Sequence, residues 1–229
     1  MNELASRVFR SDVQSMHAYA VQPSAGLLKM DAMENPHRLP ADLQAELGRR
    51  LGALALNRYP GDRINGLRAA LARHAGMPAG YELMLGNGSD ELISLLAMAC
   101  DRPRASILAP VPGFVMYSMS AQLQGLKFIG VDLTPDFELD ESAMLEAIRQ
   151  HRPTLIYLAY PNNPTANLWD DAVIERIIEA APGLVGWFYG DESVFAVFRY
   201  GSREFPLAIQ QAGLVLDPSS RHPKYSLLD

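Results

Sequence analysis

Two polar groups that could bind a ring-shaped cofactor each follow a buried apolar run in this chain. The run 154–159 leads into the pair Asn162-Asn163, held between two prolines, and the run 184–189 leads to Asp191. In an open α/β sheet, ligands bind at the carboxyl ends of the strands. An amide donor and a carboxylate placed there suit a flat heteroaromatic cofactor, because one can hydrogen-bond a ring oxygen and the other can pair with a ring nitrogen.

Two further loops carry groups that suit the same kind of ligand. The stretch Gly86–Asp90 lies between an expected strand and an expected helix. Its glycines allow a tight turn, and the N–H groups at the start of a helix attract a phosphate. Phe114 follows another expected strand, where its ring could stack on a planar ligand.

Each of these patterns also has a purely structural interpretation. The stretch Gly86–Asp90 is typical of an ordinary capped turn, and Phe114 of a core aromatic at a helix start. The asparagine pair could form a proline-rigidified turn, Asp191 could cap a helix, and Tyr59 in an earlier loop could be a surface residue. The order of the loops on successive strand–helix units favours the cofactor interpretation, because it is the order needed to surround one ligand.

The elements that must position these loops form an α/β fold, predicted as a mostly parallel sheet with helices on both faces. Leucines at four-residue spacing (Leu43, Leu47 and Leu51) predict a helix after Pro40, and a second helix is expected to end at Gly76. Strands are expected over 83–85, 106–109, 127–133, 154–159 and 184–189, with helices between them. Asp140 is expected to cap one of these helices.

The composition excludes several classes of function. The 229 residues are 48% hydrophobic and 20% charged, which is typical of a soluble globular protein, and the net charge of −6 argues against a nucleic-acid surface. A single cysteine, Cys100, allows no disulfide or cysteine metal site within the chain. Without a long apolar stretch or an apolar leader, we expect no membrane association and a cytoplasmic location.

Five stretches together point to one family: 30–36, Asn57-Arg58-Tyr59-Pro60, Gly88-Ser89-Asp90-Glu91, Phe114-Val115-Met116-Tyr117 and Pro161-Asn162-Asn163-Pro164-Thr165. The pattern resembles the fold-type I aminotransferases that use pyridoxal phosphate, and within them the histidinol-phosphate branch. The resemblance extends from about residue 19 to about residue 192. It implies transamination between histidinol phosphate or imidazole-acetol phosphate and glutamate or 2-oxoglutarate, in histidine biosynthesis. A relative such as a threonine-phosphate decarboxylase would share much of the pattern.

The resemblance also implies roles for individual residues of the large domain. Ser89 and Asp90 would hold the phosphate of pyridoxal 5'-phosphate, and Phe114 would stack on its ring. Asn163 would donate to the ring's phenolic oxygen. Asp191 would pair with the protonated ring nitrogen.

The partners and domains follow from the same resemblance. Tyr59 would reach the cofactor phosphate of a partner subunit, which implies a homodimer, and Tyr19 and Asn35 would meet a small amino-acid or phosphorylated substrate. Residues 1–40 would form an N-terminal arm and 41–229 an incomplete large domain, with the small C-terminal domain missing. The divergent tail, 192–229, contains an aromatic stretch that we expect to cover part of one sheet face.

The sequence departs from the family at the residue that binds the cofactor covalently. The chain has three lysines, Lys29, Lys127 and Lys224, and Arg221 stands at the aligned lysine position. Arginine stays protonated and cannot offer the free amine that this bond needs. No catalytic residue is therefore predicted, and impaired activity is expected unless Lys224 substitutes. An inactive cofactor-binding or dimer-partner protein, or a gene remnant, is the alternative. Ala166 also replaces the family's glycine.

Overall fold

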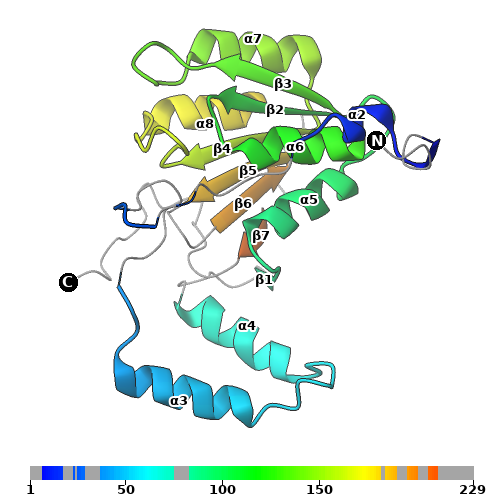
Figure 1. Cartoon of the computed structure of the whole chain (residues 1–229). Coiled ribbons are helices and arrows are strands. Elements are labelled where there is room, and N and C mark those ends of the chain that lie inside the picture. Colours follow the sequence, from blue (N-terminus) through cyan, green and yellow to red (C-terminus); the bar gives the residue numbers. More distant parts are fainter. Residues whose placement is uncertain are drawn as a thin grey trace.

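The computed structural model describes residues 7–17, 23, 25–28, 37–74, 83–181, 184–189, 195–200 and 206–210. Its centre is a seven-stranded sheet in the order β1-β7-β6-β5-β4-β2-β3 (Figure 1). The strands are β1 (Leu83–Met84), β2 (Ser106–Val111), β3 (Lys127–Asp132), β4 (Leu155–Tyr160), β5 (Leu184–Tyr189), β6 (Phe195–Tyr200) and β7 (Pro206–Gln210).

The sheet is mostly parallel, as predicted. The pairs β1/β7, β2/β3, β2/β4 and β4/β5 run parallel, and only β6 runs against its two neighbours, β5 and β7. The aromatic stretch of the tail therefore pairs as strand β6 instead of covering a face of the sheet. Its aromatic and β-branched residues suit a strand, and the free edge of β5 supplies the hydrogen-bonding partner.

Helices cover both faces of the sheet, which confirms the predicted layers. On one face, α5 (Ser89–Ala99) and α6 (Val115–Gln124) pack against Ile107 and Tyr157. On the other, α7 (Glu141–His151) and α8 (Asp171–Ala180) pack against Leu108 and Ile156. Neighbouring strand residues thus enter different cores, because side chains alternate across a strand. None of the helices in the described ranges is long and apolar enough to cross a membrane.

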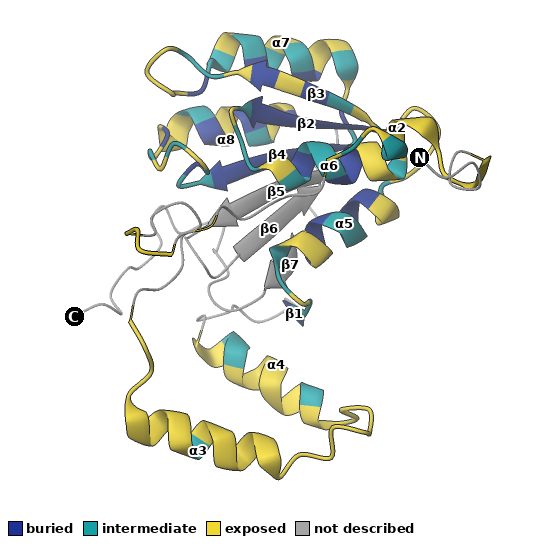
Figure 2. Cartoon of the chain, in the orientation of Figure 1, coloured by how far each residue is buried: buried dark blue, intermediate teal, exposed yellow. Residues whose placement is uncertain are grey.

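The helices α3 (Ala41–Gly52) and α4 (Arg63–His74) form where the leucine spacing predicted them, but neither has a buried residue. Figure 2 shows both in the colours of exposed and partly exposed residues, apart from the sheet.

A short N-terminal helix, α2 (Ser11–Gln14), lies against the end of α6. There the guanidinium of Arg10 donates to the backbone carbonyls of Gln122 and Leu123, at 2.7 and 2.9 Å.

Candidate functional site

The predicted binding loops follow parallel strands at their carboxyl ends. Gly86–Asp90 follows β1, the residues 112–114 follow β2, and the residues 161–167 follow β4. We call these the glycine loop, the aromatic loop and the amide loop. Figure 1 shows the arrowheads of β2 and β4 at the same edge of the sheet. Asp191, Tyr19 and Asn35 lie outside the described residues, so their predicted roles stay predictions.

The glycine loop presents the start of α5 without a side-chain cap. Gly88 is the N-cap residue, with a φ of 95° that a side chain would strain, and no side chain hydrogen-bonds the first turn as a cap. The Ser89 hydroxyl makes only a long contact, 3.4 Å, with a carboxylate oxygen of Asp90. The Glu91 carboxylate accepts from the backbone N–H of Asn87. The donor set at this helix start therefore fits a phosphate.

The aromatic loop is a tight backbone turn that starts helix α6. A side chain at Gly113 would place its Cβ 2.5 Å from the carbonyl oxygen of Pro110, so only glycine fits there. Phe114 is half-buried, and its ring meets Tyr117 edge-on with centroids 5.7 Å apart. Phe114 is thus anchored to the core along one side while remaining partly accessible.

The two tyrosines beneath the aromatic loop are structural. Tyr117 stacks on Tyr157 with ring centroids 4.5 Å apart, and the Tyr157 hydroxyl donates to the carbonyl of Ile93. Burial raises the pKa of both phenols well above the ordinary value. Both therefore stay neutral and are not placed to move protons.

The amide loop separates its two asparagines. Asn162 is 3% exposed and its side-chain amide donates to the carbonyl of Pro112 (3.2 Å) and to the Thr165 hydroxyl (2.8 Å). Asn163 is half-buried, and within the described ranges its side chain has no hydrogen bond, which leaves its amide available to a ligand. The sequence analysis assigned Asn163 and missed Asn162.

Tyr59, a predicted site residue, and Lys127, a lysine that was not predicted to serve the site, both lie away from this part of the sheet. Tyr59 lies in the loop between α3 and α4 and is 97% exposed. Lys127, the only lysine among the described residues, begins β3 at the opposite edge of the sheet. It lines a hollow of about 550 Å³ together with Arg102 and Arg104.

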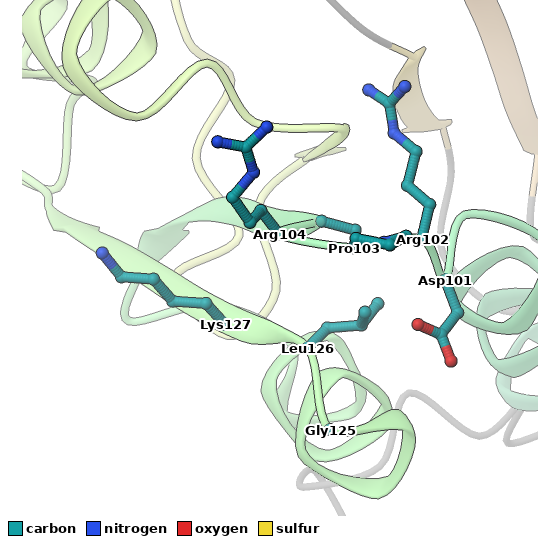
Figure 3. A pocket seen from close by; sticks show the side chains of 8 residues that line it. Asp101, Arg102, Pro103, Arg104, Gly125, Leu126 and Lys127 are labelled. Carbon is teal, nitrogen blue, oxygen red and sulfur yellow. The ribbon is translucent and has the colours of Figure 1, made fainter.

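Figure 3 shows the cations of this hollow pointing in different directions instead of converging. The C-terminal ends of α5 and α6 also lie here, and their partial negative charge suits nearby cations. The helix ends therefore explain why cations line this hollow. Lys127 cannot reach the binding loops, which lie at the other edge of the sheet. Across the described ranges, no group of three or more acidic, histidine or cysteine side chains could hold a metal.

Comparisons with known proteins find relatives that match most of the chain. The family model for aminotransferase class I and II matches residues 28–216. A histidinol-phosphate aminotransferase of Polaromonas naphthalenivorans is 70% identical over 199 residues, covering 86% of this chain and 54% of its own length. One of Methylibium petroleiphilum is 76% identical over 175 residues, covering 76% of this chain and 47% of its own. The chain thus spans about half the length of the curated relatives it matches.

Solved structures show the same fold. Histidinol-phosphate aminotransferase of Sinorhizobium meliloti, in complex with pyridoxal-5'-phosphate, has a TM-score of 0.63 at 23% identity, over 79% of this chain and 50% of that one. The enzyme of Clostridium acetobutylicum has a TM-score of 0.57 at 19% identity, over 69% and 45%.

Proposed function

Since this chain belongs to the class I and II aminotransferase family, we propose that it binds pyridoxal phosphate at the carboxyl edge of its sheet. We further propose that the protein transfers an amino group between histidinol phosphate and 2-oxoglutarate. The substrate rests on the names of the relatives that share 70% and 76% identity with it.

The observation that carries the proposal is that the amide and aromatic loops are linked while their proposed ligand-binding side chains remain accessible. A hydrogen bond joins the two loops, and the side-chain amide of Asn163 is left available beside them. Phe114, in the aromatic loop that this bond joins to the amide loop, is half-buried and so keeps part of its ring accessible. A stacking surface and an amide donor together suit a ring-shaped ligand.

Each remaining residue has a task set by its chemistry. Ser89, Asp90 and the backbone N–H groups of α5 hold the phosphate, and Asp191 pairs with the ring nitrogen. When bound, pyridoxal phosphate supplies an electron sink that stabilises negative charge on the carbon next to the amine. The protein's part is to orient the ring and to keep the ring nitrogen protonated.

The homodimer and the cytoplasmic location belong to the same proposal. Tyr59 is almost completely exposed between two exposed helices, which supports a role toward a second subunit rather than toward its own sheet. Tyr19 and Asn35 would meet the substrate from the N-terminal arm.

A second candidate is cofactor binding without turnover. It is favoured by the placement of Lys127 at the edge opposite the binding loops, and by Arg221 at the aligned position of the family's lysine. In this case the chain would bind pyridoxal phosphate reversibly and would act alone or beside a second copy.

The test is a pyridoxal phosphate titration of the purified chain, followed by borohydride reduction and peptide mass mapping. We expect Asn163→Ala to weaken binding by about tenfold or more, because a hydrogen bond to a charged group is lost. Asn65→Ala, at an exposed asparagine of α4, is the matched control and should bind normally. A reduced adduct on Lys224 supports transamination. Reversible binding without an adduct supports the second candidate, and no binding rejects both.

A further inference from the structure

Asn162 is one of three buried polar residues in the part of the chain that the structure describes. Burying a polar group lowers stability unless the group is hydrogen-bonded, and the polar groups of Asn162 form several hydrogen bonds. Its side-chain Nδ2 donates to Pro112 O and to Thr165 Oγ1. Its backbone N–H donates to Asn167 O at 3.0 Å, and its carbonyl accepts from Ala166 N at 2.7 Å.

The bond to Pro112 joins two loops that the sheet does not hold together at this point. Strands β2 and β4 pair at Ile107↔Leu155 and Leu108↔Ile156, and no pairing beyond Leu108 is found in the described residues. The loops that follow these strands carry Phe114 and Asn163. The amide of Asn162 reconnects the two strand ends beyond the last ladder pair.

Both sides of this link are closely packed or hydrogen-bonded. On the aromatic side, the Gly113 turn leaves no room for a Cβ. On the amide side, Thr165 Oγ1 is hydrogen-bonded to Asn167, whose side chain donates to Phe137 O at 2.8 Å. A displacement of one loop would therefore move the other through Asn162, because the close contacts in each turn limit local rearrangement.

We infer that Asn162 is a positioning residue that fixes Phe114 relative to Asn163. The inference deepens the proposed function and rests on it, since both residues are proposed to hold the ring. Asn162 itself touches no cofactor. Its contribution is to keep the stacking surface and the amide donor at one separation before the ligand arrives, which reduces the ordering cost of binding.

An ordinary turn asparagine would behave differently. The bonds from Asn162 to Thr165, Ala166 and Asn167 stay within the amide loop, and a turn residue would need only these. The bond to Pro112 alone reaches the aromatic loop. The two roles therefore differ in one measurable respect: only a residue that links the loops should change amide exchange in residues 113–117 when it is replaced.

The experiment combines amide hydrogen exchange of the chain without ligand with a pyridoxal phosphate titration. Asn162→Asp keeps the shape but removes both N–H donors. We expect about tenfold faster exchange in residues 113–117 and about tenfold weaker binding because, of the two lost bonds, the one to Pro112 holds the aromatic loop. Asn163→Asp, the same substitution one residue away, should weaken binding and leave exchange in 113–117 unchanged. Thr165→Val should disturb exchange only in 161–167.

The inference is overturned if Asn162→Asp speeds exchange in 161–167 alone, as Thr165→Val does. Should Asn162→Asp fail to fold, the uncharged Asn162→Ser gives the same comparison in 113–117. If the unmodified chain binds no pyridoxal phosphate, the proposed function fails, while the exchange comparison still decides whether Asn162 links the two loops.

Discussion

The helix pairs α3/α4 and α7/α8 are built on the same spacing of apolar residues, yet they end in opposite environments. Leucines 43, 47 and 51 of α3 remain 44–49% exposed. In α7 and α8, by contrast, Met144, Ile148, Ile174 and Ile177 are almost completely buried against the sheet. Periodicity therefore predicts that a helix forms and which face is apolar. It does not say what that face contacts.

The ion pairs of the two helix pairs show a similar difference between local and long-range contacts. Glu46 pairs with Arg49 and Arg50 inside α3. Glu141 of α7 pairs instead with Arg176 of α8, so that one ion pair joins two helices. Helix α7 also has a local pair, Glu146 with Arg149, so the difference is that α7 and α8 add contacts distant in sequence to the local ones.

The largest expected difference concerns apolar side chains. Ile174→Ala should cost about 2–5 kcal/mol of unfolding free energy, because it removes fully buried methyl groups and leaves a cavity. Leu47→Ala removes a side chain that is 44% exposed and should change it by less than about 0.5 kcal/mol. Urea unfolding of both variants measures this. A cost above 2 kcal/mol for Leu47→Ala would mean that α3 is packed in solution, and the comparison would fail.

Helix caps should give the next effect. The Asp170 carboxylate accepts from the backbone N–H groups of Ala172 and Val173, so Asp170→Ala should destabilise the sheet domain by about 1 kcal/mol. The N-cap of α3 is Pro40, which supplies no such bond. Pro40→Asp should raise helix content by circular dichroism and leave the urea midpoint unchanged. A shift of that midpoint would show that α3 and the sheet unfold together.

The C-terminal ends of the helices sharpen the contrast with an effect of opposite sign. Helix α7 ends at Arg152 with a φ of 45°, a left-handed conformation that a side chain disfavours. Arg152→Gly should therefore stabilise the protein by about 1 kcal/mol in thermal or urea unfolding. Helix α3 ends at Ala53 with a right-handed φ of −84°, so Ala53→Gly should slightly lower helix content instead. If glycine stabilised or destabilised the protein equally at the two positions, the assigned difference in backbone conformation between Arg152 and Ala53 would be wrong.

The smallest effect is expected from pH. Arg176 lowers the pKa of the Glu141 carboxyl below its ordinary value, and Arg49 with Arg50 lowers that of Glu46. A carboxyl whose pKa is lower in the folded state stabilises the folded protein at pH values above its unfolded pKa. This stabilisation is lost as the pH falls through the folded pKa. Glu141→Gln should therefore flatten the acid limb of the urea midpoint between about pH 5 and 3. Glu46→Gln should leave that limb unchanged, because α3 has no buried residue and is expected to unfold separately from the sheet whose unfolding sets the urea midpoint.

Much of this arrangement could be predicted from the sequence, and the exceptions have physical reasons. Strand β5 begins and ends where the apolar run 184–189 does. Helix α5, one of the helices expected between the strands, begins at Ser89, where Gly88 adopts a conformation that ends the loop. Asn162 was missed because two adjacent asparagines look alike in sequence. Contacts formed by folding distinguish them, among them the bond from Asn162 to the carbonyl of Pro112, fifty positions away.

The pairing of β1 with β7, through Leu83↔Ala208 and Met84↔Ile209, has a consequence for the order of events during synthesis. Chains fold as they emerge from the ribosome, N-terminal parts first. Strands β2, β3 and β4 find one another among neighbours in the chain, whereas β1 must wait until residues near 208 have been made. The aromatic and amide loops can thus form on the nascent chain while the glycine loop is held only at its α5 end, because β1 still lacks its partner strand. The ring-holding part of the site is therefore expected to mature before the phosphate-holding part.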